Sequence, residues 1–113
     1  MEGSFWKVRS TVKQVLKELH DEKYKLGILS NAPYHQGILA FLEANDLVQN
    51  FDAIATSALI GFCKPDRRAF EYILKKIKSK PRESIMIGDD LKNDIFGAQQ
   101  IGMKTIYIKN NFN

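Results

Sequence analysis

Cysteine is nearly absent from this chain of 113 residues, which contains only Cys63. A single cysteine excludes an intramolecular disulfide and a metal site built from cysteine pairs. No apolar run approaches the roughly 20 residues needed to cross a bilayer, and no signal peptide opens the sequence. These absences predict an intracellular, cytoplasmic protein with no membrane partner.

A large excess of charge of one sign is also missing. Lys and Arg number 17 against 13 Asp and Glu, which leaves a net charge of +4. The densest basic run, residues 75–82, follows an apolar stripe at helical spacing and therefore predicts a solvated helix face and its exit turn. This pattern argues against a nucleic-acid site. A modest positive balance would instead help to attract a phosphorylated small molecule.

The most informative stretch is residues 85–95. It begins with a short run rich in isoleucine, which predicts a buried parallel strand at 84–87 that stops at Gly88. Apolar residues at helical spacing follow, and they predict a helix that begins just after position 90. The residues with this spacing are Leu91, Ile95 and Ala98.

Three carboxylates, those of Asp89, Asp90 and Asp94, therefore lie at the carboxyl end of a predicted strand. Open α/β sheets bind their ligands at this edge. Carboxylate oxygens suit a hard cation such as Mg²⁺. The simpler alternative is that Asp90 or Asn93 caps the helix and that Asp94 occupies a favourable first turn. That alternative accounts for one acid better than for three.

The rest of the chain alternates between helical and extended patterns. Helices are predicted at 7–22, 35–45 and 66–78, and strands at 25–30, 51–57 and 104–108. Strands that alternate with helices favour a parallel sheet with right-handed crossovers. We therefore predict a single α/β domain over residues 1–113, with a Rossmann-like three-layer αβα architecture and about four mostly parallel strands.

Two further polar groups are expected at the same edge of this sheet. Ser30 ends a predicted strand, and the backbone N–H groups after it point toward a helix start, which makes an anion cradle. Lys64 precedes another helix and offers a mobile positive charge. A hydroxyl, an ammonium and a metal site together would bind phosphate. Each also has a plainer interpretation, since Ser30 could be a turn residue and Lys64 one of many surface lysines.

Three short motifs follow one another along the chain: Leu29-Ser30-Asn31, Lys64-Pro65-Asp66, and Gly88-Asp89-Asp90 with Asp94. In this order they resemble the motifs of the haloacid dehalogenase-like (HAD) hydrolase superfamily. The similarity extends over about residues 8–108 and is nearest to the phosphatase branch, such as the phosphoglycolate phosphatase-like proteins. A dehalogenase is less favoured, because metal-binding acids suit phosphate chemistry.

The resemblance implies a role for each of these side chains. Ser30 and the backbone of Asn31 would hold the transferring phosphoryl group, and Lys64 would neutralise the phosphate and the nucleophile. Asp89 would bind Mg²⁺ directly. Asp90 would bind it directly or through water. Asp94 would orient Lys64 or support the metal shell. This division suits phosphoryl transfer, which depends on positioning and charge neutralisation.

The family's first motif is absent. That motif is an Asp-x-Asp pair on the first strand, where one acid is the nucleophile and the other the general acid or base. The only aspartates close together in this sequence are Asp89 and Asp90, followed by Asp94. No aspartate follows a predicted strand near the N-terminus. The cap that selects the substrate in this family is missing as well. The chain therefore resembles the C-terminal part of such an enzyme.

This absence has a structural consequence, because the family's first strand lies between the strands that end at Ser30 and at Gly88. Without it, those strands either leave a gap or pair directly. We therefore expect a repacked four-stranded sheet or a homodimer formed through the open edge.

Two functions remain open. The first is Mg²⁺-dependent hydrolysis of phosphate monoesters by ancestry, weak or absent in the isolated chain. The alternative is a truncated or split half that binds phosphate or Mg²⁺ and needs a partner chain with the nucleophile. A purely structural domain with coincidental acids is the plainest interpretation, and three ordered motifs argue against it.

Overall fold

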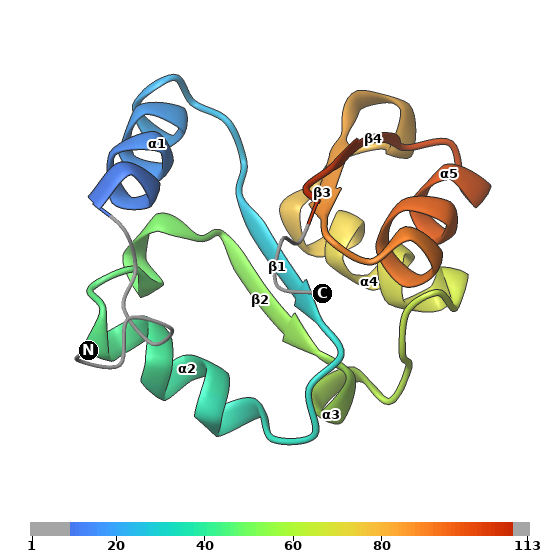
Figure 1. The fold of residues 1–113 in the computed structure, drawn as a ribbon, viewed down its shortest axis with the longest axis horizontal. Coiled ribbons are helices and arrows are strands. Elements are labelled where there is room, and N and C mark those ends of the chain that lie inside the picture. The colour runs from blue at the N-terminus through green and yellow to red at the C-terminus, as the bar shows by residue number, and fades with distance from the viewer. Residues whose placement is uncertain (1–9, 110–113) are drawn as a thin grey trace.

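The computed structural model describes residues 10–109, in which short helices alternate with four short strands (Figure 1). The strands are β1 (Gly27–Ser30), β2 (Ala53–Thr56), β3 (Ile85–Gly88) and β4 (Lys104–Tyr107). The helices are α1 (Ser10–Asp21), α2 (His35–Ala44), α3 (Ser57–Ile60), α4 (Arg67–Ile77) and α5 (Gly97–Gln100). Three other helical turns are η2 (Val48–Asn50), η3 (Pro81–Glu83) and η4 (Leu91–Phe96). The predicted α/β class with parallel strands is confirmed.

The four strands form two parallel pairs. β1 pairs with β2 from Gly27 opposite Ala53 to Ser30 opposite Thr56. β3 pairs with β4 from Ile85 opposite Lys104 onward. Within the described part of the chain, no ladder joins β1 to β3. The gap that the sequence left open as one possibility is therefore present, and the four strands have not repacked into one continuous sheet.

One hydrophobic core holds the two pairs together. Helix α4 packs against β1, β2 and α5, so it joins the two halves of the fold. The centre of this core is Phe70, which is fully buried. The buried residues of the core are Leu29, Ala55, Ala69, Phe70, Ile73, Leu74, Ala98 and Met103. Because residues from both halves share this core, the carboxyl ends of β1 and β3 keep a defined relation to each other.

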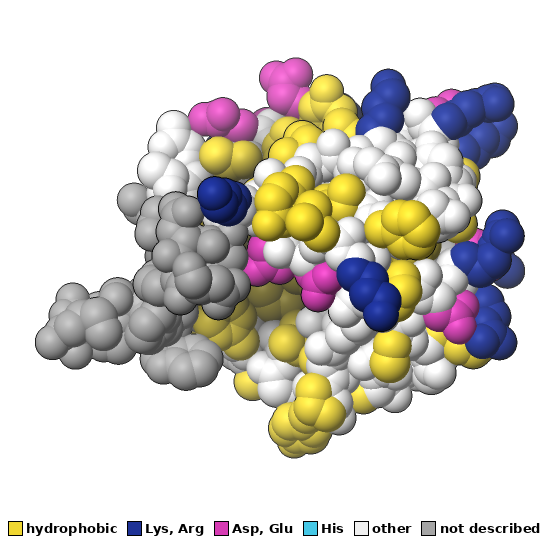
Figure 2. All heavy atoms as spheres, turned by 45° about the vertical axis from the view of Figure 1, so that its right-hand side comes forward, with side chains coloured by type: hydrophobic (Ala, Val, Ile, Leu, Met, Phe, Trp, Pro, Cys, Tyr) yellow, Lys and Arg dark blue, Asp and Glu magenta, His cyan; other side chains and the backbone are white. Residues whose placement is uncertain are grey.

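The other face of the β3–β4 pair is poorly covered. Ile85, Ile87 and Ile106 alternate along the two strands, and each is about half exposed. Met86, between the two isoleucines, packs against the core instead. Figure 2 shows apolar side chains exposed on the face that it views, with acidic side chains beside them. Among the described helices, none is long and apolar enough to cross a membrane.

Two segments differ from the sequence prediction. Residues 57–60, expected to end a strand and enter a loop, form the short helix α3, because the hydroxyl of Thr56 accepts a hydrogen bond from Leu59 N and caps a first turn. The helix after Asp90 begins with a wide π-helical turn, in which Ile95 N donates to Asp90 O at 3.2 Å. Such turns are frequent at functional sites. The predicted start of the first helix, residues 7–9, lies outside the described residues.

Helix α4 begins as the sequence predicts, with Asp66 as its N-cap. The Asp66 carboxylate accepts hydrogen bonds from Arg68 N at 2.9 Å and from Arg68 Nη2 at 2.7 Å. The side-chain hydrogen bond from Arg68, followed by the backbone one, lowers the pKa of Asp66 from 3.8 to about 2. The charged carboxylate therefore stabilises the fold fully above pH 3.8, and this contribution is lost as the pH falls toward about 2.

We accordingly expect Asp66→Asn to make the free energy of unfolding less dependent on pH in acid. Asparagine keeps the cap but cannot ionise, so the wild type should lose more stability than the variant between pH 4 and pH 2. Urea unfolding followed by circular dichroism at several pH values would measure this difference. Glu43→Gln, an exposed change on α2, is the control. Parallel pH profiles for the wild type and Asp66→Asn would contradict the expectation.

Candidate active site

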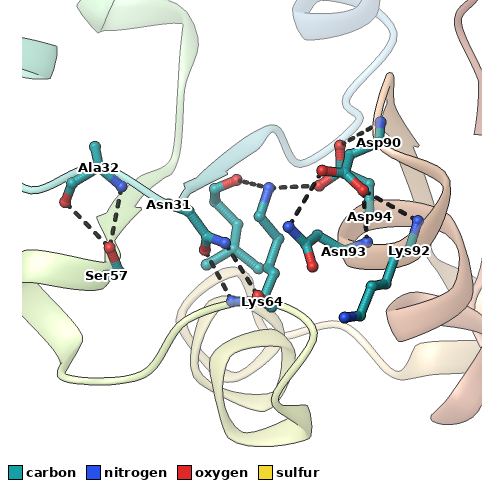
Figure 3. A network of polar contacts seen from close by, with 9 residues as sticks. Asn31, Ala32, Ser57, Lys64, Asp90, Lys92, Asn93 and Asp94 are labelled. Carbon is teal, nitrogen blue, oxygen red and sulfur yellow. Dashed lines mark hydrogen bonds and ion pairs between the residues drawn. The ribbon is translucent and has the colours of Figure 1, made fainter.

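The ammonium of Lys64 lies between the two halves of the fold. Its Nζ donates to the carbonyl oxygen of Leu29 on β1 at 2.8 Å and to Asp94 Oδ1 at 2.6 Å (Figure 3). The side chains of Lys64 and Asp94 are only 9% and 8% exposed. An ammonium has three N–H donors. Two of them meet these acceptors, and the third makes no hydrogen bond to the described part of the chain, so it can bind a ligand.

Asn31 holds the backbone of the same lysine. Its Oδ1 accepts a hydrogen bond from Lys64 N at 2.8 Å, and its Nδ2 donates to Lys64 O at 3.0 Å. These two bonds connect residues 33 positions apart in the chain. The structure thus brings together two of the predicted phosphate-binding residues, Asn31 and Lys64, at the end of β1.

The loop after β1 is tied to the loop after β2. Ala32 N donates to Ser57 Oγ at 3.0 Å, and Ser57 Oγ donates back to Ala32 O at 3.1 Å. The N–H of Ala32 is therefore already occupied. The hydroxyl of Ser30 and the N–H of Asn31 make no hydrogen bond to other described residues, so these are the donors that the loop can offer to an anion.

The carboxylate of Asp90 caps the π-helical turn. Its Oδ1 accepts from Lys92 N at 3.0 Å and from Asn93 N at 2.8 Å, and its Oδ2 accepts from Asn93 Nδ2 at 3.1 Å. The capping role that the sequence offered as the simpler alternative for Asp90 is therefore observed. Asp94 is buried beneath it, with Oδ2 accepting from Asp90 N at 3.3 Å. Its Oδ1 meets Lys64, which is the contact required for orienting that lysine.

The three aspartates do not form one metal cluster by themselves. Within residues 10–109, no group of three or more Asp, Glu, His or Cys side chains is gathered so as to hold a metal ion. Asp94 is committed to Lys64, whereas Asp89 is exposed and makes no hydrogen bond to the described residues. Mg²⁺ is commonly bound by one or two carboxylates and retains several waters. Asp89 and Asp90, as oxygen donors at a strand end, fit such a site, and Asp94 fits it less well.

Two features of this site were not evident from the sequence. Ser57 was expected only as the end of a strand, although its position at the same edge as Ser30 is a signal that it could meet the neighbouring loop. Asn31 was expected to act through its backbone, yet its side chain makes both contacts with Lys64. The assignment of Ser30, Asn31, Lys64, Asp89, Asp90 and Asp94 to phosphate or metal binding stays a prediction.

Comparison with known protein families matches residues 3–108 to the haloacid dehalogenase-like hydrolase family. The chain belongs to this family. The match extends over nearly the whole sequence, so it includes every residue of the site. The family resemblance inferred from three short motifs is thereby confirmed.

Relatives of this HAD-like chain include phosphatases. The glyceraldehyde 3-phosphate phosphatase of Pyrococcus furiosus is 36% identical over 99 residues, which cover 86% of this chain and 40% of the relative. The crystal structure of a HAD phosphatase from Thermococcus onnurineus superimposes with a TM-score of 0.85 at 31% identity, covering 94% of this chain and 48% of that one. A magnesium-bound HAD-hydrolase from Bacillus subtilis has the same fold, with a TM-score of 0.85 at 24% identity over 96% of this chain and 47% of its own. The HAD-like chain thus spans less than half the length of these three proteins.

Proposed function

We propose that this chain carries the phosphate-binding and charge-neutralising half of a site that hydrolyses phosphate monoesters. The observation that carries the proposal is the position of Lys64, whose ammonium is held by Asp94 and by the end of β1 beside Ser30. Within residues 10–109, this buried ammonium has one unused N–H, and the Ser30 hydroxyl and the Asn31 N–H make no hydrogen bond. Such a set of donors suits a phosphoryl group. The phosphatase relatives support this substrate class.

Each residue would contribute positioning or charge. Ser30 Oγ and Asn31 N–H would donate to oxygens of the phosphoryl group, and Lys64 Nζ would neutralise its negative charge. Asp94 would keep that ammonium aimed into the site, because Asp94 Oδ1 accepts a hydrogen bond from Lys64 Nζ at 2.6 Å. Groups that are already in place need no reorganisation when charge shifts during transfer.

We further propose Mg²⁺ as the cofactor, with Asp89 and Asp90 as its protein ligands. When bound, the ion would supply positive charge to the phosphoryl oxygens. Asp89 is the better candidate for a direct ligand, because its exposed carboxylate has no competing hydrogen bond within the described residues. Asp90 would contribute while its carboxylate continues to cap η4.

The nucleophile has to come from outside the described residues. Of the three acids after β3, Asp94 is ion-paired to Lys64 and Asp90 is a helix cap. Asp89 is the proposed metal ligand, so none of the three is left for the role. The family resemblance assigns the nucleophile to a strand between β1 and β3, and the proposal is that such a strand inserts there. Lys104 N donates to Ser84 O, and Ile108 N donates to Gly88 O. The backbone groups of Ser84 and Gly88 therefore face β4. By alternation, Ile85 and Ile87 present their backbone groups to the gap.

Within the described residues, the unpaired edges of β1 and β3 favour the second function that the sequence allowed, a half-site that needs a partner. The partner strand could come from a complementing N-terminal chain or from a second copy of this chain. Light scattering distinguishes these sources in part, because a compact monomer in the absence of other proteins rules out the homodimer. Residues 1–113 would then act as a partial HAD-like core domain.

Hydrolysis of an aryl phosphate by the purified chain tests this function. We expect no turnover above background with Mg²⁺ or with EDTA, and Mg²⁺-dependent turnover once a peptide with the family's Asp-x-Asp strand is added. In that complex, Asp89→Asn should lower the rate by at least about 100-fold, because charge stabilisation is lost. Turnover by the chain alone that requires Asp89 would show that the nucleophile is within it. No turnover and no binding of orthophosphate would overturn the phosphatase assignment.

A further inference from the structure

The side chain of Asn31 makes an unusual pair of contacts for an exposed residue after a strand. Its amide oxygen accepts from Lys64 N, and its amide nitrogen donates to Lys64 O, at 2.8 and 3.0 Å. A turn asparagine ordinarily bonds to its own backbone or to water. Here a single amide satisfies both backbone groups of one residue on a distant loop (Figure 3). This arrangement fixes the peptide on both sides of Lys64.

The end of β1 therefore holds Lys64 at two places. Asn31 holds its backbone, and the carbonyl of Leu29 accepts from its ammonium at 2.8 Å. Ser30, the last residue of β1, lies between Leu29 and Asn31 in the sequence. A lysine side chain is long and loses much of its rotamer freedom when it is fixed. Anchoring the backbone limits the positions from which the ammonium can reach Leu29 O and Asp94.

We infer that Asn31 is a positioning residue, whose side chain sets the location of the Lys64 ammonium relative to Ser30. This inference deepens the proposed function and rests on it for its chemical purpose. The role needs a donor and an acceptor at the reach of an asparagine amide. An aspartate in its place could accept from Lys64 N, but it would set a carboxylate oxygen against Lys64 O and lose the second bond.

A second clamp in the same loop provides a matched control. Ser57 also makes two hydrogen bonds to one backbone, that of Ala32, at 3.0 and 3.1 Å. It fixes the loop after β1 without touching Lys64. Removing either side chain costs the loop two hydrogen bonds, so a general loosening of the loop should follow from both changes. A loss of order at Lys64 should follow only from the change at Asn31.

The test compares Asn31→Asp, Asn31→Ala and Ser57→Ala in the full chain by nuclear magnetic resonance. We expect hydrogen exchange at the Lys64 amide to accelerate by at least about ten-fold in Asn31→Ala, in which the acceptor for this N–H is lost. In both Asn31 variants the Lys64 Nζ and Cε resonances should shift. The affinity for inorganic phosphate should fall by about ten-fold, the effect of one misplaced hydrogen bond. Ser57→Ala should leave the Lys64 resonances unchanged.

The outcomes separate this inference from the function on which it rests. Folded Asn31 variants with unchanged Lys64 exchange and side-chain resonances would overturn the positioning role. Equal changes in Ser57→Ala would also overturn it, since they would reduce Asn31 to a loop stabiliser. The wild type could bind no phosphate while the Asn31 variants still show faster Lys64 amide exchange and shifted Lys64 side-chain resonances. In that case the proposed function fails, but the positioning of Lys64 by Asn31 holds. Circular dichroism confirms that each variant is folded.

Discussion

Replacing Lys64 with methionine should lower the free energy of unfolding by about 3–5 kcal/mol, because it leaves Asp94 buried without its partner. Both side chains are less than one tenth exposed, and the Nζ–Oδ1 distance is 2.6 Å. A buried carboxylate that loses its cation keeps the full cost of desolvation. Domains of this size are stable by only about 5–15 kcal/mol, so the variant should unfold at a much lower urea concentration.

Two controls separate this effect from ordinary charge removal. Glu71→Gln breaks the exposed Arg67–Glu71 pair, whose side chains are 69% and 49% exposed, and should cost no more than about 0.5 kcal/mol. The double change Lys64→Met with Asp94→Leu removes both buried charges and should recover part of the loss. A double variant as unstable as the sum of Lys64→Met and Asp94→Leu, each measured alone, would show that the pair itself is not the cause. Urea unfolding of the wild type and of these four variants measures the differences.

Gly88→Ala should lower the free energy of unfolding nearly as much as Lys64→Met, although it adds only a methyl group. A Cβ atom at Gly88 would lie 2.5 Å from Asp94 Cγ and 2.6 Å from Asp94 Cβ, and it would overlap Asp94 Oδ2. Because Asp94 is anchored to Lys64 and to Asp90 N, the first turn of η4 has to move to make room. We expect a loss of about 3–5 kcal/mol, since the shift breaks the buried ion pair.

Gly27→Ala is the matched control, because Gly27 also lies in a strand beside the core. Its Cβ would meet side-chain atoms of two isoleucines, Ile73 Cγ1 at 3.1 Å and Ile77 Cγ2 at 3.4 Å, which are longer contacts than those at Gly88. A shift of a few tenths of an ångström relieves these contacts, so the loss should be at most about 1 kcal/mol, at the low end for overpacking. Equal losses in the two variants would refute a specific role for the contact between Gly88 and Asp94. Urea unfolding gives the loss, and the Lys64 Nζ resonance reports whether the ion pair has broken.

Helix α4 illustrates how far local patterns can predict structure. Its apolar stripe and the capping residue Asp66 are adjacent in sequence, and the observed helix, Arg67–Ile77, lies within the predicted range of 66–78. Strands β1 and β3 were likewise located, to within two residues, by short apolar runs that end at a polar residue or a glycine. The short helix α3 was missed because four residues hold too little periodicity, and a cap from Thr56 decided its start.

The candidate site was likewise predicted only in part from local sequence. Spacing alone placed Ser30, Lys64 and the acids after Gly88 at strand ends or before helices, and the order of these motifs identified the family. Spacing did not decide between the roles that were open for Asp94, nor did it indicate that the side chain of Asn31 would hold Lys64. These contacts join residues 30 and 33 positions apart, so they depend on how α4 packs the two halves together.

The separation of β1 from β3 was also decided only in three dimensions. The sequence allowed either a gap or direct pairing, because both strands carry similar apolar residues and no local signal specifies a neighbour. In the fold, the Lys64–Asp94 pair and the shared core hold the strands in place without a ladder between them. Local propensity therefore determines which elements form and where their polar ends lie. Long-range packing determines which of those ends meet, because only packing brings distant side chains within hydrogen-bonding distance.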